Sequence, residues 1–93
     1  MMSDIDRVKQ AYLEVLLPLD PNARVEVEAG ASDYLHVIAV SSAFEGQKTT
    51  KRNQVNREAI RRLGMIFAMR ITVVLLLTPQ EHEQMQEEAV AFA

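Results

Sequence analysis

The basic residues near the middle of this 93-residue chain are the first candidates for binding chemistry. Seven of its ten lysines and arginines lie between Gly46 and Arg70, together with one acid, Glu58. The stretch FEGQKTTKRNQ, residues 44–54, carries the first three where an expected strand gives way to an expected helix. Because a helix N-terminus presents free N–H groups and partial positive charge, added cations favour an anion such as phosphate. The candidate anion- or nucleic-acid-binding residues are Lys48, Lys51, Arg52 and Arg57.

A solvated helix face is the other interpretation of this basic segment. Glu58 and Arg62 stand four residues apart, as in an ordinary helical ion pair, and Arg61 and Arg62 suit a helix C-terminus before Gly64. The stretch EGQK has one glycine, whereas a KH domain clamps nucleic acid with a GxxG loop. No aromatic residue interleaves with the basic run to stack on bases. Both interpretations stay open at this point.

The two histidines do not indicate a metal site or an enzyme. His36 falls inside an expected strand, where a half-covered structural role is the simplest interpretation. His82 lies between Glu81 and Glu83, but adjacent helix residues diverge by about 100° and cannot face one ion. We expect His82 to be a surface histidine. No glycine-framed serine, P-loop or dinucleotide fingerprint is present, so we expect no catalytic residues, no metal and no enzyme activity.

Composition favours a single soluble cytoplasmic domain over residues 1–93. The chain has no cysteine, which excludes disulfides and thiolate ligands and suits a reducing compartment. Its acidic, polar start does not resemble a signal peptide. The longest apolar run, Ile71–Leu77, is far shorter than the roughly 20 residues that cross a bilayer. We therefore expect no membrane partner.

The first half of the chain predicts a helix followed by a β-hairpin. Ser3 begins a capping pattern and apolar residues follow at helical spacing, which predicts a helix from about Asp4 to Leu17. The alternating stretch ARVEVE predicts an edge strand, and AGASD the hairpin connection, with Gly30 free to take positive φ. A second strand is expected over Tyr34–Ser41.

The second half predicts helix, strand and helix. A helix is expected from about Thr50 to Leu63 with Gly64 as its C-terminal cap, and MIFAM as a short further turn. The apolar Ile71–Leu77 is expected as a central, buried strand. Thr78 caps a last helix with Met85, Ala89 and Phe92 on one face.

This αββαβα order predicts an α+β domain: a three-stranded mixed sheet with helices packed on it. The first two strands form an antiparallel hairpin. The helix between the second and third strands predicts a right-handed crossover, which makes those strands parallel.

The stretch YLHVIAVSSAFEGQKTTKRNQVNREAI resembles the signature of the BolA-like family. LLLTPQE is similar to that family's closing strand and helix start, and RVEVEAGASDYLHV lies where the family has its hairpin. The resemblance covers about residues 4 to 84. It implies a fold similar to the class II KH arrangement.

The resemblance implies three roles: adaptors that share an iron–sulfur cluster with a monothiol glutaredoxin, stress-linked regulators of cell shape, and DNA-binding regulators. Asn53 stands where many members have histidine, Arg70 lies where the ligand histidine precedes the final strand, and AGASD has no Cys or His. Arginine does not replace imidazole at iron. We expect no intrinsic cofactor, and a [2Fe–2S] cluster shared with glutaredoxin is an alternative that these residues do not favour. Asn53 and Arg70 are the candidate partner-surface residues.

The leading expectation is thus a non-enzymatic BolA-like stress or morphogenesis regulator, or an adaptor that acts through protein interaction in iron–sulfur homeostasis. The alternative is a nucleic-acid-binding module, such as a DNA-binding transcriptional regulator, that uses the basic helix start. A homodimer formed through the exposed edge of the hairpin strand is a third hypothesis.

Overall fold

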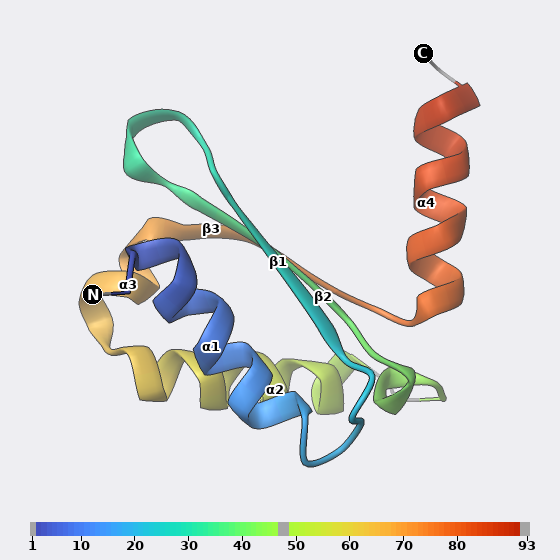
Figure 1. Cartoon of the computed structure of the whole chain (residues 1–93), viewed down its shortest axis with the longest axis horizontal. Coiled ribbons are helices and arrows are strands. Elements are labelled where there is room, and N and C mark those ends of the chain that lie inside the picture. Colours follow the sequence, from blue (N-terminus) through green and yellow to red (C-terminus); the bar gives the residue numbers. More distant parts are fainter. Residues whose placement is uncertain (1, 47–48, 92–93) are drawn as a thin grey trace.

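The computed structural model describes residues 2–46 and 49–91 as an α+β domain (Figure 1). The elements, in chain order, are α1 (Asp4–Leu16), β1 (Arg24–Ala29), the 3-10 turn η1 (Ala31–Asp33), β2 (Leu35–Val40), the 3-10 turn η2 (Ser42–Phe44), α2 (Thr49–Leu63), α3 (Met65–Arg70), β3 (Ile71–Leu77) and α4 (Pro79–Ala91). The expected α+β class is confirmed, and the stretch MIFAM lies within the short helix α3.

The sheet has the order β1-β2-β3. β1 runs antiparallel to β2 and β3 runs parallel to β2, which confirms the mixed sheet and the pairing expected from the crossover. The prediction of a central place for β3 is wrong, because β2 lies in the middle and β3 forms an edge. β3 has apolar residues on both of its faces, yet it pairs with a strand along only one of its edges.

One face of the sheet packs on α1 and α2, which lie side by side beneath it (Figure 1). Val25, Leu35 and Val37 point to this face and are buried with Tyr12 in a single core. The Tyr12 hydroxyl donates a hydrogen bond to Oδ1 of Asn56, which joins the two helices. Burial raises the pKa of Tyr12 to about 12.

The opposite face of the sheet is only partly covered. The β2–β3 register places three apolar or half-apolar pairs there: His36 with Val73, Ile38 with Leu75, and Val40 with Leu77. α4 contacts mainly β3 and stands apart from α1 and α2 (Figure 1). Helices α1 and α2 thus pack on one face, while the other face is half-buried along most of β2 and β3 and exposed at Val73. Met85 is half-buried and Ala89 exposed, while Phe92 lies outside the described residues.

Two glycines have different roles from each other. Gly64 adopts φ 92° and its N–H donates to the Ile60 carbonyl at 2.9 Å, which confirms the expected end of α2. Gly30 does not use its freedom to take positive φ: its φ is −96°, and Ser32 and Asp33 take the left-handed conformation instead. Gly30 serves close approach, because a Cβ there would lie 3.2 Å from Nε2 of His36.

Candidate functional site

The structure describes three of the four predicted anion-binding residues, and their side chains do not all lie on the same side of α2. Lys48 lies outside the described residues. Lys51 and Arg57 are exposed on α2, and within residues 2–46 and 49–91 neither forms an ion pair. Arg52 turns the other way, toward the sheet.

Arg52 holds the crossover together. Its Nη1 donates to the carbonyl of Leu76 on β3 at 2.9 Å and to Oε1 of Glu81 on α4 at 2.8 Å. Its Nη2 donates to the carbonyl of Phe44 at 3.1 Å, and the guanidinium lies 5.8 Å from the Phe44 ring centroid. These donors of Arg52 thus face a carboxylate and two carbonyls, while its role in an anion site at the start of α2 stays a prediction.

Glu81, at the start of α4, is the carboxylate that accepts from Arg52. Oε1 of Glu81 accepts from the Thr78 N–H at 2.8 Å, and the Glu81 N–H donates to the Thr78 hydroxyl at 3.1 Å, which is a capping box. The Thr78 N–H, followed by Arg52, lowers the pKa of Glu81. Arg52 and Glu81 thus connect α2, β3 and α4 at one end of the sheet.

Arg70 forms a similar clamp at the opposite end of β3. Its Nε donates to the Asp33 carbonyl in the hairpin turn at 2.9 Å, and its Nη1 to Oδ2 of Asp4 on α1 at 2.9 Å. Its guanidinium lies 5.9 Å from the Phe67 ring centroid. Arg70 is only 28% exposed in its side chain, so this candidate partner-surface residue mainly ties the hairpin to α1.

The last turn of α2 carries a local carboxylate–arginine network. Arg61 donates two hydrogen bonds to Glu58, at 2.6 and 3.0 Å, and Arg62 donates to Glu58 at 3.3 Å. The hydrogen bonds from Arg61, assisted by Arg62, lower the pKa of Glu58 to about 2. These contacts match the solvated-face interpretation of Arg61 and Arg62.

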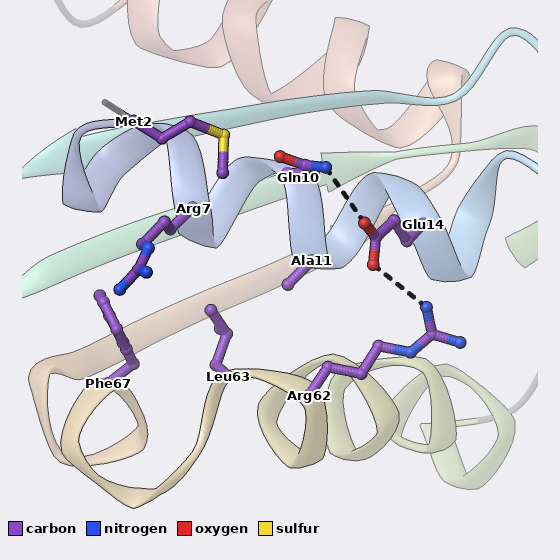
Figure 2. Close-up of a pocket in the computed structure, with 8 residues that line it drawn as sticks. All are labelled: Met2, Arg7, Gln10, Ala11, Glu14, Arg62, Leu63 and Phe67. Carbon is purple, nitrogen blue, oxygen red and sulfur yellow. Dashed lines mark hydrogen bonds and ion pairs between the residues drawn. The ribbon is translucent and has the colours of Figure 1, made fainter.

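A cleft of about 330 Å³ lies between α1 and the α2–α3 corner. Figure 2 shows Gln10, Glu14 and Arg62 joined across one side of it, with Glu14 accepting from both others at 3.1 and 3.3 Å. Arg7 points toward Phe67 at the other side. Because Glu14, Arg7 and Arg62 all line the cleft, its charges do not favour either an anionic or a cationic ligand.

Two further hollows adjoin the predicted residues. Lys51 lies at a pocket of about 490 Å³ between the end of α1 and the start of α2, and the apolar lining residues are Val15, Leu19, Ala43, Phe44 and Val55. Asn53, the other candidate partner-surface residue, is exposed and lines a groove of about 340 Å³ beside β3, with Val74 and Leu76 as its apolar wall. The groove runs along the outer edge of the sheet.

The histidines lie on different elements and form no metal site in the part of the chain that the structure describes. His36 is half-buried, as expected, and its imidazole ring packs over Gly30. The prediction of a surface position for His82 is wrong, since only 5% of it is exposed. A surface position was predicted because His82 is flanked by two glutamates in the sequence. Adjacent residues of a helix point in different directions, so His82 is buried while both glutamates are exposed.

The residues at the places that the family resemblance implies for cluster ligands do not fit an iron–sulfur cluster. The hairpin turn offers Ser32 and Asp33, and Arg70 extends from the other ligand position to bond with Asp33. A guanidinium is a permanent cation and supplies no lone pair to iron.

The most exposed apolar surface was not among the predicted sites. Met65, Ile66 and Met69 on α3 are 78%, 78% and 74% exposed, and we call these three residues the α3 patch. A sequence signal existed: MIFAM is apolar at every position, and a helix of six residues cannot bury all its sides. Only Phe67 and Ala68 turn partly inward.

A buried polar cluster was also missed. Asp20 accepts hydrogen bonds from the Ser41 hydroxyl at 2.8 Å, from the Ser42 N–H at 3.1 Å and from the Asn22 N–H at 3.0 Å. The bond from Asn22, followed by that from Ser41, lowers the pKa of Asp20. Because its oxygens are bonded to backbone and hydroxyl donors, Asp20 ties the turn after α1 to the end of β2.

Comparisons with known proteins identify no relative. No protein-family model matches the chain, and searches of curated proteins and of solved structures find no match. Among the described residues, no helix combines the length and apolar character that a membrane crossing requires.

Proposed function

We propose that this chain is a non-enzymatic interaction module, an adaptor or regulator that binds a partner protein through the α3 patch. The observation that carries the proposal is the exposure of Met65, Ile66 and Met69, each 74% or more. Contiguous exposed apolar side chains on a small domain are typical of interaction surfaces. Methionine adapts its shape to a partner, which suits such a surface.

Arg70 borders the α3 patch. Arg70 follows Met69 and is held by Asp4 and the Asp33 carbonyl, so its position is set before a partner arrives. An apolar centre with an ordered arginine at its border is the usual anatomy of a protein interface. The BolA-like resemblance favours a monothiol glutaredoxin as the partner and a stress or morphogenesis regulator as the role. Since the ligand residues are lacking, we propose a complex that does not depend on a shared cluster.

Mixing the chain with a monothiol glutaredoxin tests the proposal. We expect a larger species in sedimentation velocity both with and without the cluster's visible absorption. Ile66→Asp should abolish it, because a carboxylate would be buried at the centre of the contact. Leu19→Asp is the matched control, since Leu19 is 62% exposed but lies on the turn after α1. Equal loss of binding with both variants, or no complex at all, contradicts the proposal.

A nucleic-acid-binding module is the second candidate, supported by the exposed cations Lys51 and Arg57 on α2. Two phosphate contacts would make the logarithm of duplex affinity fall with the logarithm of salt concentration with a slope of about −1.8. Lys51→Glu with Arg57→Glu should abolish this binding and leave the fold intact. Arg7→Glu with Lys9→Glu, two exposed cations on α1, is the control with the same change in charge. Undetectable binding at low salt eliminates this candidate.

A further inference from the structure

The outer edge of β3 is defined by two hydrogen bonds. The N–H of Ser41, which follows β2, donates to the Leu77 carbonyl at 3.0 Å, so Leu77 faces β2. Because backbone groups alternate along a strand, Leu76 and Val74 direct their N–H and C=O groups away from the sheet. Arg52 confirms this direction, since it reaches the Leu76 carbonyl from α2. The Arg52 contact covers one carbonyl near the C-terminal end of this edge.

The side chains of β3 do not protect the rest of that edge. Strand edges in proteins are usually blunted by charged residues, proline or a covering element. β3 is ITVVLLL, with neither charge nor proline, and Thr72 and Val73 are exposed. At the other edge, β1 carries exposed Arg24, Glu26 and Glu28. Only one of the two edges therefore has the chemistry that discourages another strand.

We propose that β3 is a pairing edge for a second copy of this chain, with two β3 strands antiparallel about a two-fold axis near Val73 and Val74. In such an isologous pair each strand meets its own sequence in reverse, so Val73 lies against the apolar residues in the middle of the other β3. Apolar β-branched and aliphatic cross-strand neighbours stabilise each other. The apolar residues of β2 and β3 on the face that carries Val73 then adjoin those of the second copy, while the charged residues of β1 lie toward the two outer edges.

Charge distribution favours a second copy over an unrelated apolar strand. In an antiparallel pair, α4 of one copy begins beside the end of β3 that follows Arg70 in the other. α4 contains four glutamates and no lysine or arginine, whereas residues 51–70 contain six basic residues and one acid. The acidic helix of each copy therefore begins near Arg70, the basic residue that directly precedes β3 in the other. Opposite charges in this arrangement direct the register and weaken with salt.

The size of the contact sets the expected strength. One pair of seven-residue strands is small beside a permanent dimer interface. We therefore expect a monomer–dimer equilibrium that shifts with protein concentration. This inference goes beyond the proposed function and uses a different surface, because β3 and not the α3 patch forms the contact.

Sedimentation equilibrium on the full chain tests the pairing. Val73→Lys places a cation near the axis on a side chain that is already 41% exposed, so the monomer should fold. We expect the dimer dissociation constant to rise about tenfold or more. Ala29→Lys adds the same charge at an exposed position of β1 and should leave the dissociation constant unchanged. Mixing Val73→Lys with Val73→Glu should restore a dimer, because opposite charges then meet.

Each other outcome overturns the proposal. Wild-type protein that stays monomeric at all accessible concentrations shows that the edge does not pair. Equal dissociation by Val73→Lys and Ala29→Lys would indicate a general charge effect, and failure of the mixed variants to associate would show that residue 73 is not at the contact. A dimer lost with Ile66→Asp but kept with Val73→Lys would place the interface on the α3 patch instead.

Discussion

The two edges of the sheet are protected in different ways. β1 alternates inward-facing valines, of which Val25 is buried, with exposed charges, so its own side chains discourage a further strand. β3 has no charged side chain and relies on Arg52, a residue 24 positions before Leu76, which bonds to one outer carbonyl. Protection built into a strand acts along its whole length, whereas protection from another element acts only where that element reaches. The remaining length of β3 is thus the part of the sheet most open to a partner.

Removing the arginine clamp should have the largest effect on this contrast. Arg52→Met removes the Arg52 donor from the Leu76 and Phe44 carbonyls and leaves the Glu81 carboxylate with the Thr78 N–H alone. We expect the free energy of unfolding to fall by about 2–4 kcal/mol, since hydrogen bonds to charged groups contribute more than neutral ones. Urea denaturation measures the change. Arg57→Met, an exposed arginine on the same helix, should change it by less than about 0.5 kcal/mol.

The second largest effect should be a difference in stability loss between alanine substitutions of a buried valine on β1 and an exposed valine on β3. Val25 of β1 is 3% exposed and packs in the core, whereas Val73 of β3 is 41% exposed on the open face. We expect Val25→Ala to lower the free energy of unfolding by about 2 kcal/mol, through lost apolar burial and a residual cavity. Val73→Ala should cost well under about 1 kcal/mol at concentrations where the protein is monomeric. Similar losses at both positions would mean that the open face is covered.

Acid should weaken the β3 side of the sheet through Glu81. Its folded-state pKa is lowered by Thr78 and Arg52, so the unfolded chain takes up its proton at a higher pH than the folded one. The stabilisation is complete above the ordinary glutamate pKa of about 4.3 and is lost as pH falls through the lower folded value. Urea midpoints measured between pH 7 and pH 2 should fall less steeply for Glu81→Gln than for the wild type. Parallel curves for the two proteins would contradict this assignment.

Asp20 and Glu58 contribute to the same acid loss in both proteins, because their pKa values are lowered as well. The difference between the wild-type and Glu81→Gln curves therefore isolates the clamp.

Removing charge from β1 should have the smallest effect on stability and a visible effect on association. Glu26→Val with Glu28→Val gives this edge the apolar character of β3, while both positions stay exposed. We expect the free energy of unfolding to change by less than about 1 kcal/mol and higher oligomers to appear in sedimentation velocity. Glu26→Gln with Glu28→Gln removes the same charge but keeps polar side chains. Oligomers in neither variant would show that charge is not what protects β1.

Local patterns predicted much of the fold. The expected strand Ile71–Leu77 has the observed bounds, and the starts of α1 and α4 follow from Ser3 and Thr78. Capping and alternation depend on residues a few positions apart, so the sequence displays them directly. The candidate site was predicted less well: four cations close together in sequence suggested one patch, but Arg52 turns inward while Lys51 and Arg57 stay exposed.

By itself, the sequence determined the order of the elements, the mixed pairing of the strands and the segregation of basic from acidic residues. Only the tertiary structure decided that β3 is an edge, that His82 is buried and that Arg52 and Arg70 bind carboxylates from distant helices. The physical reason is range. A strand's apolar pattern records that its faces avoid water, but which element lies against each face depends on how the whole chain packs.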